Sequence, residues 1–164
     1  MKRLTAVNSS SLKLAGVLLA LEALLFFVQP RWDAVLRWQL DGSFKTITGY
    51  VLLATMALMW APVWVRKHLQ QAHHLEILKL VHQWMGVLVL LVFLLHANLA
   101  RSGYLAVLSL VLLAGSGLGT VLGWLQLTGR ATGRRWLMAA HIALGAVVSG
   151  FSLLHLYFVY AYAG

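Results

Sequence analysis

The sequence contains no cysteine and very few acidic residues. The lack of cysteine excludes disulfide bonds, thiolate-ligated metal clusters, cysteine nucleophiles and cofactors tethered through cysteine. Only 4 of the 164 residues are Asp or Glu, against 13 Lys or Arg. A metal-transport site would need carboxylate or thiolate ligands, and the apolar segments offer almost none.

Apolar residues make up 61% of the chain and charged residues 10%. Average globular domains are about half apolar and about a quarter charged. A soluble domain of this length could not bury so much apolar surface, which rules out a soluble enzyme, a disordered tail and a nucleic-acid-binding module. The net charge of +9 does not indicate a nucleic-acid partner, because the basic residues are scattered between apolar runs.

Five apolar runs are long enough to cross a lipid bilayer. They lie at about 12–28, 46–65, 80–100, 104–126 and 136–160, the second being interrupted near Pro62. The sequence therefore predicts an all-α fold, an integral membrane bundle of five transmembrane helices forming one membrane domain over 1–164. No small-residue cleavage site follows the first run, so we expect that helix to be retained.

The segment at about 31–40 carries apolar residues at helical spacing. This pattern predicts a short amphipathic helix lying at the membrane surface. The alternative is an irregular loop with tryptophans at headgroup level.

Basic residues divide unequally between the two sides of the predicted bundle. Nine fall on the side of the N-terminus: Lys2, Arg3, Lys13, Arg66, Lys67, Lys79, Arg130, Arg134 and Arg135. Four fall on the other side: Arg31, Arg37, Lys45 and Arg101. Since cytoplasmic loops are enriched in Lys and Arg, we expect a cytoplasmic N-terminus and an external C-terminus, in a bacterial inner membrane.

Four of the seven histidines lie inside predicted spans, in two pairs of equal spacing. His82 and His96 share the third span, and His141 and His155 share the fifth. A separation of 14 residues is about 40° short of four helical turns and about 21 Å along the axis. Both histidines of a span therefore face the same side, one near each leaflet.

The two histidine-bearing spans are also similar to each other. Aligning 82–96 with 141–155 gives six identities over 15 positions, which include both histidines and the glycines Gly86 and Gly145. One crossing helix separates the two spans, so they run parallel. His82 then matches His141 in depth, and His96 matches His155. Imidazole suits iron, and two imidazoles at one depth can hold one iron from opposite faces.

This arrangement resembles the dihaem core of cytochrome b from bc complexes, and is similar to the membrane domains of ferric reductases and NADPH oxidases. The resemblance covers the last three predicted spans, about half of the chain. It implies two non-covalent b-type haems, one held by His82 and His141 and one by His96 and His155. It also implies that Gly86 and Gly145 make room for the macrocycles. The chain is much shorter than the cytochrome b of bc complexes and shows no NAD- or flavin-binding domain.

We therefore expect a small membrane cytochrome b subunit that carries electrons across the bilayer. Its expected partners are membrane lipid, the quinone pool and a redox subunit or protein. One alternative is a self-contained oxidoreductase acting on quinone, metal or superoxide, and another is a non-redox transporter or assembly factor. Whether the chain is itself an enzyme stays open.

Several other residues have two interpretations. Arg101 follows His96, and Arg134 and Arg135 precede His141, so they either bind haem propionates or only set topology. Glu22, the one acidic residue inside a span, is either a proton acceptor near a quinol site or a carboxyl kept neutral or paired in the bundle.

The remaining polar and small residues of note lie in one loop and one span. His68, His73 and His74 lie in a basic loop, where binding of lipid headgroups is favoured over a further metal or haem site. Gly115, Gly119 and Gly123 line one face of the fourth span, which predicts close helix packing, with contact to a haem edge as the alternative.

Overall fold

The computed structural model describes residues 9–28, 33–65, 72–97, 103–130 and 133–162. Every regular element in these ranges is a helix. In chain order they are α1 (Ser9–Val28), α2 (Asp33–Leu40), α3 (Gly42–Met59), α4 (Ala61–Val65), α5 (Ala72–His96), α6 (Gly103–Leu127) and α7 (Arg134–Ala161). The predicted all-α class is confirmed for the part of the chain that the structure describes.

Within the described residues, three helical segments are long and apolar enough to cross a membrane. They are Ile77–His96 of α5, Gly103–Leu127 of α6 and Arg134–Ala161 of α7. Helices α1 and α3 cover the other two predicted spans but do not fall in this set. Three of the described helices are therefore compatible with a membrane protein, and the predicted arrangement of five transmembrane helices stays a hypothesis.

Local sequence signals set the ends of α3. Asp41 is its N-cap, and the Asp41 carboxylate accepts a hydrogen bond of 2.7 Å from the amide of Phe44. The helix ends at Met59, with Trp60 as its C-cap, directly before the short α4, which contains Pro62. Proline has no amide hydrogen to continue the ladder, so the predicted span at 46–65 is divided into two helices.

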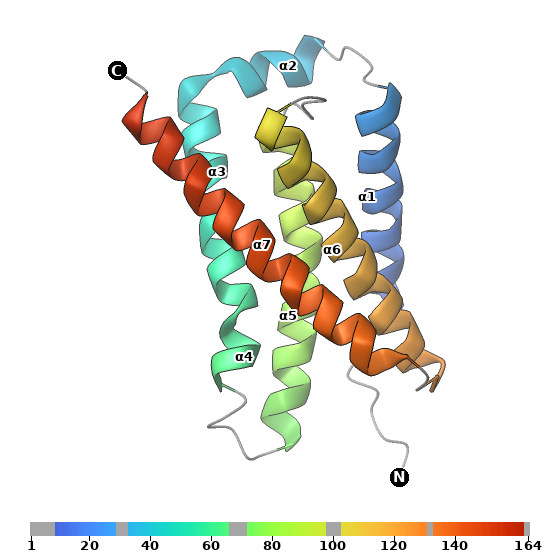
Figure 1. Ribbon diagram of the computed structural model, residues 1–164. Helices are drawn as coiled ribbons and strands as arrows, with labels where there is room; N and C mark the ends of the chain where they lie inside the picture. Colours follow the sequence, from blue (N-terminus) through green and yellow to red (C-terminus); the bar gives the residue numbers. More distant parts are fainter. Residues whose placement is uncertain (1–8, 29–32, 66–71, 98–102, 131–132, 163–164) are drawn as a thin grey trace.

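The long helices form two layers (Figure 1). Helix α3 packs along α5 in one layer, and α6 packs along α7 in the other. Across the layers, the described backbones of α5 and α7 make no extended contact, nor do those of α5 and α6. The space between the layers is therefore spanned by side chains, and this space holds the four span histidines.

Helix α1 closes one side of this space, because it packs against both α5 and α6. The apolar core lies there and continues between the layers. Its buried members are Leu25, Val89, Phe93, Leu108, Leu112 and Val148. Val89 and Val148 each lie seven residues from both histidines of their own helix. Apolar side chains thus fill the levels between the two histidine positions.

Helix α2 lies across one end of the bundle, within the range 31–40 for which the sequence predicts a helix (Figure 1). Gln39 is buried, and its side-chain amide donates to the carbonyls of Leu94 at 3.2 Å and Ala97 at 3.0 Å. These bonds satisfy carbonyls at the end of α5 that have no partner inside the helix. They fix α2 against the end of α5 where His96 lies.

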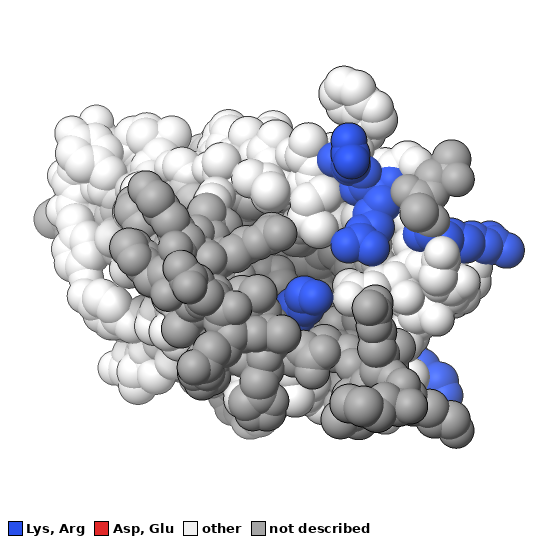
Figure 2. All heavy atoms as spheres, turned by 90° about the horizontal axis from the view of Figure 1, so that it is seen from below, with Lys and Arg blue, Asp and Glu red and all other residues white. Residues whose placement is uncertain are grey.

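The opposite end of the bundle is basic. The described residues near that end include Lys13, Lys79, Arg130, Arg134 and Arg135, and α1 begins at the same end (Figure 1). Figure 2 looks onto this end and shows Lys and Arg gathered there, with no Asp or Glu visible. The described part of the α2 end has Arg37 and Lys45. This asymmetry has the sign that the sequence predicts.

Candidate functional site

The four span histidines meet as two pairs between the layers. His82 of α5 faces His141 of α7, with ring centroids 6.1 Å apart and planes at 86°. His96 of α5 faces His155 of α7 at 6.4 Å and 83°. All four are half-buried. The pairs are those that the 14-residue register predicts, one toward each end of the bundle.

The spacing of the rings is suited to one metal between each pair. Histidine nitrogens bind metals at about 2.0–2.1 Å, and the ring centre lies about 1.1 Å behind the nitrogen, so two opposed ligands place their ring centres about 6.2–6.4 Å apart. The observed 6.1 and 6.4 Å agree with this value. Edge-to-face packing of two aromatic rings covers the same distance range, so the ring spacing alone does not identify a ligand pair.

Hydrogen bonds to the second ring nitrogen strengthen the assignment. Nδ1 of His141 lies 2.9 Å from the carbonyl oxygen of Gly115 on α6. A carbonyl can only accept, so the hydrogen is on Nδ1 and the imidazole is a donor at that position. In a neutral ring Nε2 then has a free lone pair, which is the form that binds metals.

His96 is held in the same way within its own layer, by Thr48 of α3. The Thr48 hydroxyl donates its one hydrogen to the carbonyl of Phe44 at 2.7 Å, and its oxygen lies 2.9 Å from Nδ1 of His96. The oxygen therefore accepts from Nδ1, which again leaves Nε2 of a neutral ring free. Each layer thus sets the orientation of one histidine through its own neighbouring helix.

The other two histidines have different surroundings. Nδ1 of His155 lies 3.0 Å from the phenol oxygen of Tyr104 on α6, and the two rings are 6.1 Å apart. Nδ1 of His82 is buried and has no hydrogen-bond partner among the described residues. A buried polar atom without a partner is unfavourable, and coordination of a metal through Nδ1, rather than through the Nε2 left free on His141 and His96, would supply the missing interaction. The donor set therefore fits iron with two axial imidazoles.

Two glycines lie against the histidine rings, and the sequence gives no sign that either of them contacts a histidine. A Cβ atom at Gly49 of α3 would lie 3.3 Å from Cε1 of His96, and one at Gly119 of α6 would lie 3.0 Å from Cε1 of His141. Both distances are tighter than an ordinary contact, so glycine lets the ring sit against the backbone. The stripe of Gly115, Gly119 and Gly123 has two interpretations, close helix packing or contact with a haem edge. Gly123 serves helix packing, because an added Cβ there would meet the side chain of Leu12 on α1.

The predicted haem-edge glycines, Gly86 and Gly145, face the end of α3. A Cβ at Gly86 would lie 3.9 Å from Cε of Met59, and one at Gly145 would lie 4.0 Å from Cζ2 of Trp60. Both are ordinary contact distances. Each glycine lies four residues after a histidine of the same pair, so both are near the His82–His141 level.

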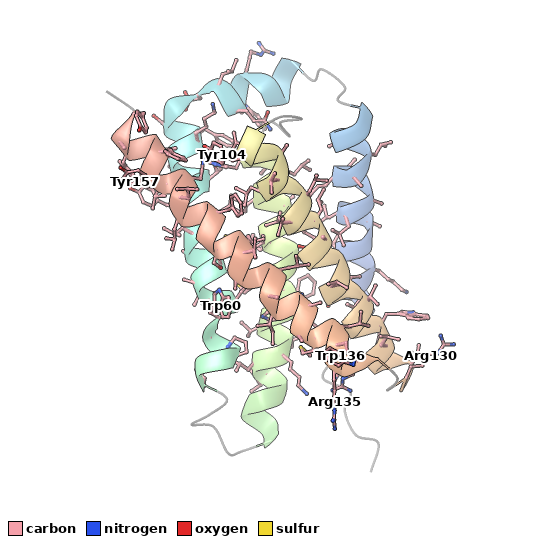
Figure 3. The ribbon with its side chains drawn as sticks, in the orientation of Figure 1. Trp60, Tyr104, Arg130, Arg135, Trp136 and Tyr157 are labelled. Carbon is pink, nitrogen blue, oxygen red and sulfur yellow. The ribbon has the colours of Figure 1, made fainter. Side chains whose placement is uncertain are left out.

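Three side-chain pairs connect α3 to α7 on the side away from α1. The indole of Trp60 donates to the hydroxyl of Ser149 at 3.0 Å, and Ser152 donates to the sulfur of Met56 at 3.6 Å. The hydroxyls of Tyr50 and Tyr160 also pair. Figure 3 shows Trp60 beside α3, opposite α7. These contacts close the second side of the space that holds the histidines.

Of the predicted propionate ligands, Arg135 is described and Arg101 is not. Arg135 is exposed in the first turn of α7, at the basic end (Figure 3), six residues before His141. Arg101 lies outside the described residues, as does His68 of the basic loop. The side chains of His73 and His74 lie outside them too.

The described residues contain no group of three or more His, Cys, Asp or Glu that could enclose a metal ion. Haem iron requires only two ligands from the protein, because the macrocycle supplies four. Comparisons with protein-family models, curated proteins and solved structures found no match to this chain. The residues and their geometry therefore carry the functional conclusion.

Proposed function

We propose that this chain is a membrane cytochrome b that carries electrons across the bilayer through two b-type haems. The two histidine pairs, with ring centroids 6.1 and 6.4 Å apart on α5 and α7, are the observation that carries this proposal. His82 and His141 hold one haem, and His96 and His155 hold the other. Haem supplies one-electron chemistry, while the protein sets ligands, orientation and polarity.

Two axial histidines leave no coordination position for oxygen or another substrate, which favours electron transfer over catalysis at iron. The two ligand levels are about 21 Å apart along the helices, and the edges of two wide macrocycles come much closer than that. The apolar side chains between the levels, Val89, Phe93 and Val148, keep water out of this path. One electron can thus pass from one side of the bundle to the other.

We further propose that α1 and α3 cross the membrane beside α5, α6 and α7, which gives five spans. Both pack along helices that are long and apolar enough to span. The basic end then lies in the cytoplasm, with the N-terminus, in a bacterial inner membrane. Arg135 at that end, and Arg101 at the other, are placed by sequence near His141 and His96 and are proposed to bind haem propionates.

The electrons are proposed to pass between the quinone pool and a partner redox protein. The alternative of a self-contained oxidoreductase predicts turnover by the isolated chain with quinol or metal. The alternative of a non-redox transporter or assembly factor predicts no haem at all. Turnover assays and absorption spectra of the purified chain therefore separate the three functions.

The test is a reduced-minus-oxidised absorption spectrum of protein purified from membranes, with haem measured against protein. We expect a b-type spectrum and two haems per chain. His96→Ala or His155→Ala should leave one haem, and His82→Ala or His141→Ala should leave the other. His68→Ala, outside the two pairs, is the matched control and should keep both. A chain without a b-type spectrum, or a His96→Ala variant that keeps two haems, would refute the proposal.

A further inference from the structure

Glu22 is completely buried in the stripe of α1 that faces α5 and α6. Residues 11, 15, 18, 22 and 25 form this stripe, and all are buried. Glu22 is 0% exposed, and neither carboxyl oxygen has a hydrogen-bond partner among the described residues. Among the described residues, the buried side-chain nitrogen and oxygen atoms without a hydrogen-bond partner all belong to Glu22 and His82.

The contacts of neighbouring residues place Glu22 between the levels of the two histidine pairs. One turn earlier, Leu18 packs with Val87 and Leu90 of α5. One turn later, Leu25 packs with Val89 and Phe93 of α5. Ser11, three turns before Glu22, also donates to the side chain of Gln83, the neighbour of His82 on α5. Glu22 therefore lies between the levels of His82 and His96.

Few ionisable side chains are described on the helices packed around Glu22. They are Lys13 on α1, Lys79, His82 and His96 on α5, and Tyr104 on α6, whereas the side chains of His73, His74 and Glu76 at the start of α5 lie outside the described part. Lys13 is nine residues away, about 13 Å along the helix, and Lys79 is still further toward the basic end. Tyr104 and His96 have their own partners, His155 and Thr48. Glu22 has no fixed counter-charge, so its ionisation responds to charge that appears at the histidine pairs.

A carboxylate in such a place is costly, because burial of an unpaired charge carries a large desolvation penalty. The penalty falls when positive charge lies nearby and returns when that charge is removed. Ferric haem has one more positive charge than ferrous haem. Reduction at either histidine pair therefore favours the protonated form of Glu22, and oxidation favours its release of a proton.

We propose that Glu22 is a redox-linked proton-binding site, a role that rests on the proposed dihaem function. An electron that entered a metal held by either histidine pair, from a quinol or a redox protein, would raise the fraction of chains in which a proton from water is bound to a carboxylate oxygen of Glu22. When the electron leaves to the acceptor, the O–H bond of Glu22 breaks and the proton returns to water. Electron and proton uptake are thus linked, with a fraction of a proton bound for each electron taken up.

The size of the coupling follows from the distance. The distance from Glu22 to the space between the two rings of each histidine pair is about 18 Å. It combines helix axes packed about 8–10 Å apart, the reach of a histidine on the far side of α5 and about half of the 21 Å separation between the ligand levels. At this distance and an effective dielectric constant of about 20, one elementary charge changes proton affinity about fivefold. A fivefold change equals about 40 mV for a one-electron couple, at 59 mV per tenfold.

The experiment is an equilibrium redox titration of the intact two-haem protein between acid and alkaline pH. Equilibrium measurement gives the buried carboxyl time to exchange its proton. We compare the native protein with Glu22→Gln, which keeps size and shape but cannot ionise, and with Glu22→Asp, which keeps a carboxyl. The native midpoint potentials should coincide with those of Glu22→Gln in acid and fall below them in alkali by about 40 mV for each haem.

Glu22→Asp should keep this additional pH dependence, and the reduced-minus-oxidised infrared spectrum should contain a protonated-carboxyl band that Glu22→Gln loses. Equal pH slopes in the native protein and Glu22→Gln, with both haems present, overturn the proton site and leave the dihaem function intact. Absence of a b-type spectrum from the native protein overturns both. If Glu22→Gln loses haem, the infrared band of the native protein and the slope of Glu22→Asp decide the matter.

Discussion

Replacement of Gly119 by alanine tests whether the backbone of α6 positions the His141 ring. The new Cβ would lie 3.0 Å from Cε1 of His141 and 3.5 Å from its Nδ1. The ring cannot simply rotate away, because Nδ1 is held at 2.9 Å by the carbonyl of Gly115. The imidazole must shift by several tenths of an ångström, and its hydrogen bond lengthens.

Two opposing effects set the magnitude. Alanine in a helix interior is favoured over glycine by about 1 kcal/mol. Overpacking a filled site costs about 1–3 kcal/mol, so Gly119→Ala should destabilise the protein by up to about 2 kcal/mol. The effect on the metal should be larger than the effect on folding, because loss of a hydrogen bond that orients a histidine ligand typically costs 10–100-fold in metal affinity.

The assay is haem content by absorption spectroscopy, with thermal unfolding measured on the same samples. Gly117→Ala is the matched control on the same helix, since nothing lies within 4 Å of a Cβ there. We expect Gly117→Ala to keep both haems and Gly119→Ala to lose the one at His82 and His141. Equal affinity of the two variants for this haem would show that the close approach of Gly119 to His141 has no part in the site.

Three further variants address the pair at the other end of the bundle. Gly49→Ala, with its Cβ 3.3 Å from Cε1 of His96, should weaken the haem at His96 and leave the other in place, as spectra of single-histidine variants would reveal. Thr48→Val removes the acceptor for His96 and should lower haem affinity about 10–100-fold, which Thr48→Ser should restore. If His155 binds iron through Nε2, its Nδ1–H donates to the Tyr104 hydroxyl and makes the imidazole a more basic ligand. Tyr104→Phe removes this acceptor, so the midpoint potential should rise by about 40 mV, equal to about 1 kcal/mol. An unchanged potential would mean that this hydroxyl has no influence on the iron.

The helices and the histidine pairs are predictable from the sequence because both follow from periodicity. Long apolar runs predict the helices, and a spacing of 14 residues fixes which face and which depth each histidine occupies. The repeat between 82–96 and 141–155 then indicates which histidines share a level. Together these patterns identify the pairs that the structure brings within 6.1 and 6.4 Å.

The neighbours that hold the rings could not be predicted in the same way. Thr48 and Gly49 lie on α3, which belongs to no repeat and is antiparallel to α5 (Figure 1), so its register against His96 depends on packing. Gly119 lies in a glycine stripe whose spacing predicts close packing, but the spacing does not indicate which side chain packs against it. A sequence signal does exist for each, a small residue inside an apolar helix. The same signal also describes Gly117, where an added Cβ would meet nothing within 4 Å.

The positioning contacts lie within layers, whereas the histidine pairs lie across them. Thr48 and Gly49 hold His96 inside the α3–α5 layer, and Gly115 and Gly119 hold His141 inside the α6–α7 layer. The α3–α5 layer therefore presents an oriented His96 to His155, which contacts Tyr104 of its own layer. The α6–α7 layer presents an oriented His141 to His82, whose Nδ1 has no hydrogen-bond partner among the described residues. A ligand bound by both histidines of a pair joins the two layers, so its binding energy adds to the stability of the bundle. The cofactor that the histidines imply would thus be a structural component of the fold as well as its redox centre.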